Sequence, residues 1–164
     1  MIISVLLNHS LSSSDKLSLI IPQIIAVLII LFLILPLHEL AHGWVAYKFG
    51  DRTAKNAGRL TFNPLVSIDP WGALMILLFG FGWARPVPVN PNNFKNPRVG
   101  MAVTAAAGPI SNFLAALIGA FIYVAVLVGS GFSVSQLSFG MELLWTFIAI
   151  NISLAVFNLI PIPP

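Results

Sequence analysis

Three long runs of apolar residues restrict the possible folds of this chain more than any other feature. They cover roughly Leu17–Tyr47, Met101–Val128 and Met141–Ile160. Each run reaches the roughly 20 residues that a helix needs to cross a bilayer. Only 8% of the 164 residues are charged, whereas a soluble domain carries about 25%. The sequence therefore predicts an all-α polytopic membrane protein with three transmembrane helices.

A fourth apolar run, Trp71–Trp83, is shorter, as is typical of a re-entrant or interfacial segment. If it does not cross the bilayer, seven of the eight basic residues share one side, which the positive-inside rule makes the cytoplasm. We therefore expect a re-entrant segment and an N-terminus outside. The net charge of +3 is then a topology signal, with no nucleic acid as partner. The seven residues are Lys48, Arg52, Lys55, Arg59, Arg85, Lys95 and Arg98.

The length indicates one domain, with an N-terminal tail at 1–16 and a membrane-embedded core at 17–164. Met1–Leu7 lacks the basic lead-in of a signal peptide. Between the first two spans, residues 58–62 and 82–89 are candidates for short extended pieces. Prolines in the second piece would restrict it to an edge strand. The chain has no cysteine, which excludes disulfides and cysteine metal ligands.

The residue pattern that carries chemistry is His38-Glu39-Leu40-Ala41-His42, inside the first span. Residues four apart share one face of a helix, so His38 and His42 can bind one Zn²⁺. Glu39 is then placed to act as general base on water. Ionisable groups are costly within a membrane and usually functional there. We therefore expect a zinc site near the cytoplasmic side. Pro36 either kinks the helix there or is a tolerated membrane-helix proline.

The other two spans carry polar residues that could contribute to the same site. Asn112 in the second span could join helices or bind a substrate backbone, beside a stripe of small residues at Ala107, Ser111, Ala115 and Gly119 that favours close helix packing. In the third span, Asn151 and Asn158 share a face. The topology brings the proline-rich end of that span, Pro161–Pro164, to the level of the histidines.

Five motifs in order resemble the site-2 protease family of intramembrane zinc metalloproteases, in its compact prokaryotic branch. The resemblance covers about Leu35 to Pro164. The motifs are His38-Glu39-x-x-His42-Gly43, Gly58-Arg59-Leu60-Thr61-x-Asn63-Pro64, Gly82-Trp83-Ala84-Arg85-Pro86-Val87-Pro88-Val89-Asn90, Ala107-Gly108-Pro109-Ile110-Ser111-Asn112 and Asn158-Leu159-Ile160-Pro161-Ile162-Pro163-Pro164.

The resemblance implies a protease in a prokaryotic cell membrane that cleaves transmembrane segments of membrane-bound regulators or signal-peptide remnants. His38 and His42 would bind the zinc and Glu39 would activate water. Asn112 and Asn158 would contact the substrate or its oxyanion. The extended pieces of the central segment would pair with an unwound substrate. The oligomeric state is not indicated.

In the family, the Asn-x-x-Pro-x-Pro-Pro motif is followed by Leu-Asp-Gly, whose Asp is the third zinc ligand. The sequence given ends at Pro164, so we expect it to lack that ligand and, made as given, to be inactive. Asp69 is a weaker substitute ligand. An inactive membrane adaptor and a membrane metal transporter are the alternative functions, and the residue after Pro164 in the gene would separate adaptor from enzyme.

Overall fold

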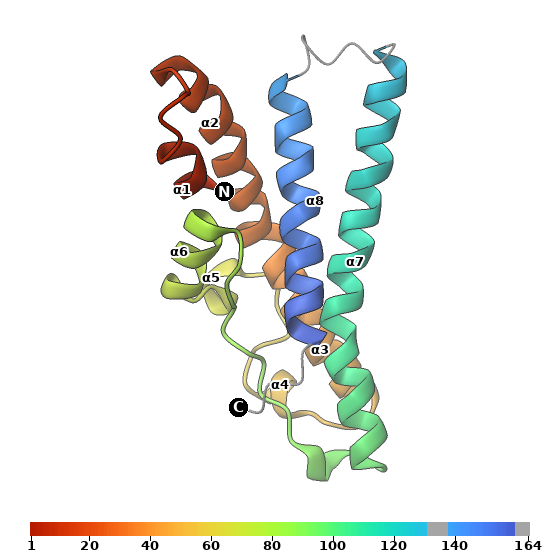
Figure 1. Cartoon of the computed structure of the whole chain (residues 1–164). Coiled ribbons are helices and arrows are strands. Elements are labelled where there is room, and N and C mark those ends of the chain that lie inside the picture. The colour runs from red at the N-terminus through yellow and green to blue at the C-terminus, as the bar shows by residue number, and fades with distance from the viewer. Residues whose placement is uncertain (131–137, 160–164) are drawn as a thin grey trace.

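The computed structural model describes residues 1–130 and 138–159, and the regular elements within these ranges are all helical. Three stretches are long and apolar enough to cross a membrane, Ser13–Lys48, Pro97–Gly129 and Phe139–Leu159. They confirm the predicted helical architecture with three candidate spans. Helices α7 (Pro97–Gly129) and α8 (Ser138–Leu159) stand side by side and antiparallel (Figure 1).

The first stretch consists of α2 (Ser13–Ile29), a π-helical turn (Ile30–Ile34) and α3 (Leu35–Lys48). In the π turn the Leu35 N–H bonds the Ile30 carbonyl, five residues back. Proline has no N–H and its ring crowds the carbonyl four residues earlier, so a wider turn directly before Pro36 accommodates it. Pro36 therefore follows a local distortion of the helix, just ahead of His38.

The hydrophobic core lies where α2, α3 and α8 meet α6 (Pro70–Phe79). The predicted N-terminal tail packs onto the same region through α1 (Ile2–Leu6), whose Ile2 is buried. Gly80 ends α6 with φ +84°, and a Cβ there would lie 2.5 Å from Cγ of Met1. The core residues are Val27, Ile30, Ile34, Leu35, Ile76, Ile150 and Leu154.

The segment between the first two spans contains three short helices besides α6: α4 (Thr53–Asn56), α5 (Pro64–Ser67) and the 3₁₀ turn η2 (Pro91–Asn93). Helix α6 has ten residues, about 15 Å of helix, which is half the roughly 30 Å of a hydrocarbon core. The apolar run Trp71–Trp83 therefore contains no helix long enough to span, and its re-entrant placement stays a prediction.

The predicted edge strands at 58–62 and 82–89 are not confirmed, since neither segment forms a strand. The hydrogen bonds of the second segment explain this. Its Arg85 N–H bonds the Ser67 carbonyl and its Val87 N–H bonds a carboxylate oxygen of Glu39. Pro86 and Pro88 have no N–H to give. The donors therefore point to several different partners instead of one neighbouring strand.

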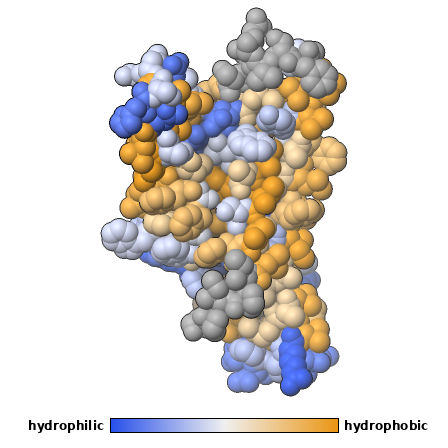
Figure 2. All heavy atoms as spheres, viewed as in Figure 1, coloured by the Kyte–Doolittle hydropathy of each residue, from blue (hydrophilic) through white to orange (hydrophobic). Residues whose placement is uncertain are grey.

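Hydrophobic residues cover the middle of the molecule and hydrophilic ones gather at its two ends (Figure 2). Large apolar side chains of α7 are exposed in the middle, among them Phe113, Ile118 and Phe121. A soluble protein rarely exposes such a continuous apolar surface. This distribution fits a molecule whose middle faces lipid.

Candidate metal and active site

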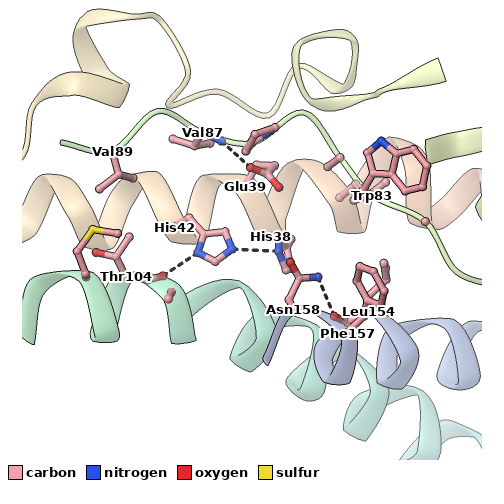
Figure 3. A pocket seen from close by; sticks show the side chains of 16 residues that line it. His38, Glu39, His42, Trp83, Val87, Val89, Thr104, Leu154, Phe157 and Asn158 are labelled. Carbon is pink, nitrogen blue, oxygen red and sulfur yellow. Dashed lines mark hydrogen bonds between the residues drawn. The ribbon is translucent and has the colours of Figure 1, made fainter. Parts of the chain in front are cut away.

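His38 and His42 meet at one point beside α7. Both come from α3, one turn apart, and their Nε2 atoms are 3.0 Å from each other (Figure 3). The ring centroids are 4.7 Å apart in an edge-on arrangement. His38 is buried and His42 is half-buried. The i, i+4 spacing therefore produces the convergence that it predicts.

The second ring nitrogen of each histidine has a partner on α7. Nδ1 of His42 lies 2.7 Å from the backbone carbonyl oxygen of Thr104, and Nδ1 of His38 lies 3.2 Å from Oδ1 of Asn112. A carbonyl oxygen only accepts, so Nδ1 of His42 carries the proton and its Nε2 holds a lone pair. With the Asn112 oxygen facing His38, the same tautomer follows there.

Two lone pairs facing each other at 3.0 Å repel, and a cation between them removes the repulsion. In a tetrahedral zinc site with Zn–N of about 2.0–2.1 Å, two ligand nitrogens lie about 3.3 Å apart. Metal-binding histidines usually donate their other N–H to a carbonyl or carboxylate, as His42 does to Thr104. The histidine pair therefore fits a zinc ion.

Gly108 leaves the space in front of the two histidines open. A Cβ at this position would lie 2.2 Å from Nε2 of His42 and 2.5 Å from Nε2 of His38. Ordinary contact begins at 3.4 Å, so any other residue would push into the histidine pair. Glycine is thus the residue that lets α7 approach this close.

Glu39 lies on the neighbouring face of α3, and only 6% of its surface is exposed. Its Oε2 accepts a 3.0 Å hydrogen bond from the backbone N–H of Val87. This contact fixes the carboxylate against the segment 81–90 (Figure 3). The bond occupies one oxygen and leaves Oε1 for other chemistry.

A cavity of about 790 Å³ contains both histidines and Glu39. Four parts of the chain surround it: α3, the segment 82–89, the start of α7 and the end of α8. Its walls are largely apolar. The lining residues include Trp83, Val87, Val89, Thr104, Leu154, Phe157 and Asn158. The cavity is therefore a largely apolar space that reaches both histidines and the carboxylate.

The two asparagines predicted to contact the substrate occupy different places. Asn158 lines the cavity, and its Nδ2 donates to the Leu154 carbonyl within α8. Asn112 is fully buried and its amide oxygen contacts His38. Asn112 is thus behind the histidine, and its role toward a substrate stays a prediction. Asn151 is also buried, with its Nδ2 bonded to the Phe147 carbonyl.

Asp69, the substitute ligand considered above, has a structural role. It caps α6 by accepting a 2.9 Å hydrogen bond from the Gly72 N–H, and it does not lie with the two histidines. Within residues 1–130 and 138–159, no three His, Cys, Asp or Glu residues come close enough to hold a metal together. We predicted that the proline-rich end Pro161–Pro164 lies close to the histidines, but these residues are outside the described ranges. Leu154 and Asn158, which precede them on α8, do line the cavity.

Sequence reasoning missed three groups that shape this site: the Val87 N–H, the Thr104 carbonyl and the absent side chain of Gly108. The stripe predicted to pack α7 is buried in part: Gly119 is buried and lies against Phe147 and Ile148 of α8, whereas Ala107, Ser111 and Ala115 are half-buried. The face of α7 toward the histidines is buried at Gly100, Thr104, Gly108 and Asn112. The four-residue spacing of this second set, which ends in an amide, was the available signal.

Comparison with known proteins places the chain. It is 45% identical over 144 residues to "Putative zinc metalloprotease YwhC" of Bacillus subtilis (strain 168), which covers 87% of this chain and 64% of that protein. It is 30% identical over 87 residues to "Putative zinc metalloprotease Rip2" of Mycolicibacterium smegmatis (strain ATCC 700084 / mc(2)155), which covers 50% of this chain and 33% of that protein.

This chain therefore spans just under two thirds of the length of the first relative. No solved structure gives a significant match. A family model described as Peptidase family M50 matches residues 26–143. That range holds the histidines, Glu39 and the segment beside them. With most of its length matched, and with the motifs of the site-2 proteases in order, the chain belongs to peptidase family M50.

Proposed function

We propose that this chain is the metal-site core of an intramembrane zinc metalloprotease. The observation that carries the proposal is the convergence of two histidine Nε2 atoms at 3.0 Å, beside a buried glutamate, within a helix apolar enough to span a membrane. His38 and His42 would hold the zinc. When bound, zinc supplies a Lewis acid that polarises the scissile carbonyl and acidifies water. The names of both relatives support this choice of metal.

Glu39 is the general base of the proposed reaction. Its Oε1 takes a proton from the attacking water as the water oxygen bonds to the peptide carbonyl carbon. The same carboxyl then gives the proton to the departing amide nitrogen as the C–N bond breaks. The Val87 N–H on Oε2 holds the carboxylate in one orientation through both steps. General acid–base catalysis of this kind typically contributes about 10²–10⁴-fold in rate.

The proposed substrate is a transmembrane segment of another protein, in the class of membrane-bound regulators or signal-peptide remnants. The largely apolar walls of the cavity support this. A helical segment must unwind before attack, because its peptide carbonyls are hydrogen-bonded. The segment 81–90, which has neither helix nor strand structure and borders the cavity, is placed to pair with the unwound chain by strand addition. Asn158 at the cavity wall would steady the substrate, and Asn112, which is buried behind His38, would act on it only through that histidine.

A catalytic zinc takes three protein ligands and leaves one position for water. The described residues bring two of them together. The resemblance to the family implies that the third would be the aspartate of a Leu-Asp-Gly sequence that follows the motif ending in Pro163-Pro164. We therefore propose that the full gene product supplies this ligand near the end of α8, where Asn158 already lines the cavity. The site would lie toward the cytoplasmic side, where the basic residues gather.

The test compares the full-length gene product with its Glu39→Gln variant in membranes of the producing cells. Mass spectrometry of protein termini is expected to find new ends inside transmembrane segments for the wild type alone. Elemental analysis of both purified proteins is expected to show equal zinc, because glutamine leaves both histidines intact. Identical termini in both samples would contradict the proposed protease. The absence of zinc from both purified proteins would contradict the proposed site.

A further inference from the structure

Asp51 is a buried carboxylate to which the proposed chemistry gives no task. It is 0% exposed and lies in a loop that is otherwise rich in basic residues. A buried charge is costly unless hydrogen bonds satisfy it. Four donors do so here: the Thr53 N–H at 3.0 Å, the Thr53 hydroxyl, the Asn93 side-chain amide at 2.7 Å and the Asn90 N–H at 2.7 Å.

The backbone of Asp51 is fixed to the helix that carries the histidines. Its N–H bonds the Ala46 carbonyl at 2.9 Å, and the Gly50 N–H bonds the Tyr47 carbonyl at 3.1 Å. Gly50 has φ +109°, which a glycine adopts without cost. These two bonds are those of a Schellman motif, which ends α3. Asp51 therefore keeps a constant position relative to the end of α3.

The partner of Asp51, Asn90, ends a stiff segment. Three of the six residues 86–91 are prolines, whose rings fix φ near −65°. The other end is held by Arg59, which donates to the carbonyls of Arg85 and Pro86. Val87 lies between these ends and donates to Glu39. Only Pro88 and Val89 lie between Val87 and Asn90, and the ring of Pro88 fixes its φ, so the position of Asn90 restricts that of Val87.

We infer that Asp51 is a positioning residue: it ties the end of the histidine-bearing helix to the proline-stiffened segment 85–91, and so sets the Val87 N–H against Glu39. This inference rests on the proposed function for its effect on catalysis, but the tie itself is a property of the fold. The two Asp51 oxygens face donors only. An amide in place of the carboxylate would turn an N–H toward one of these donors and break the tie.

The experiment measures amide hydrogen exchange and zinc content in the full-length gene product in lipid nanodiscs. Asp51→Asn is expected to raise exchange at Asn90 and Val87 about tenfold or more, because hydrogen bonds to charged groups are the stronger class. Exchange in α7 and α8 and the zinc content are expected to stay unchanged. Asn93→Ala is the matched control, since it removes a contact to Oδ1 and leaves the Oδ2 bond to Asn90.

Three outcomes overturn the inference: unchanged exchange at Val87 in Asp51→Asn, an equal rise at Val87 in Asn93→Ala, or a rise spread evenly over α7 and α8. A Glu39→Gln sample shows how much exchange at Val87 depends on its own acceptor. Cleavage in Asp51→Asn is expected to fall at least tenfold while zinc is kept. If exchange changes as expected but even the wild-type protein cleaves no substrate, the proposed function is wrong while the inferred role of Asp51 in the fold stands.

Discussion

Replacement of Gly108 by alanine tests the geometry of the histidine pair directly. The added Cβ would lie 2.2 Å from Nε2 of His42 and 2.5 Å from Nε2 of His38. Overpacking of this kind costs about 1–3 kcal/mol. If the cost falls on the metal-bound state, zinc affinity drops about 5- to 150-fold, since each 1.4 kcal/mol is tenfold. Alanine otherwise favours a helix over glycine by about 1 kcal/mol, so the helix itself is not the weak point.

The matched control is Gly129→Ala on the same helix, where a new Cβ meets nothing within 4 Å among residues 1–130 and 138–159. The assay is competition for zinc between each purified full-length protein and a chelator of known affinity. We expect the wild type and Gly129→Ala to bind zinc with equal affinity and Gly108→Ala to bind it more weakly. Wild-type affinity in Gly108→Ala would refute the reasoning, because it would mean that the zinc does not sit where the two Nε2 atoms converge.

Three further predictions follow from other contacts. Single cysteines at Arg52 and Lys95 should label from the same side of the membrane in cells, and labelling from opposite sides would refute the re-entrant placement of Trp71–Trp83. Glu142→Ala should lower the free energy of unfolding by about 1–3 kcal/mol, measured by denaturant titration in detergent. This substitution removes the 2.9 Å hydrogen bond that buried Gln23 donates to Glu142 and that joins α2 to α8. A change in zinc content in the same variant would contradict a purely structural role for Glu142. Burial alone would raise the pKa of Asp51, but the donors Asn93, Thr53 and Asn90 together hold it below its ordinary value. The stability that Asp51 adds over Asp51→Asn is therefore fully present above about pH 4 and disappears only as the pH falls below that. If thermal unfolding shows that the wild type and Asp51→Asn already have equal stability near pH 6, the lowered pKa of Asp51 is contradicted.

The sequence was sufficient for features set by local spacing. Apolar length predicted the three spans, and the four-residue separation of His38 and His42 predicted their convergence. The site-2 protease motifs predicted the family. Each of these depends on residues that are neighbours in the chain or on one helix, so no knowledge of the tertiary fold was needed.

Features set by contacts between distant segments could not be predicted in the same way. Asp51 stands in a loop whose other charged residues are basic, and its partner Asn90 lies 39 residues further on. The predicted edge strand at 82–89 does not form because the N–H groups of Arg85 and Val87 bond Ser67 and Glu39 instead of a neighbouring strand. Gly108 was visible in a motif, but its closeness to the histidine rings depends on how α7 packs against α3.

Zinc K-edge X-ray absorption on the purified full-length gene product reports the ligands of the metal itself, and so tests whether His38 and His42 hold zinc. We expect bound zinc with imidazole scattering from two histidines at about 2.0–2.1 Å. His38→Ala and His42→Ala should each lose the metal or half of that scattering, and alanine at His9, the third histidine, should change nothing. A full imidazole signal that survives in His38→Ala or His42→Ala would mean that these two histidines do not hold the zinc.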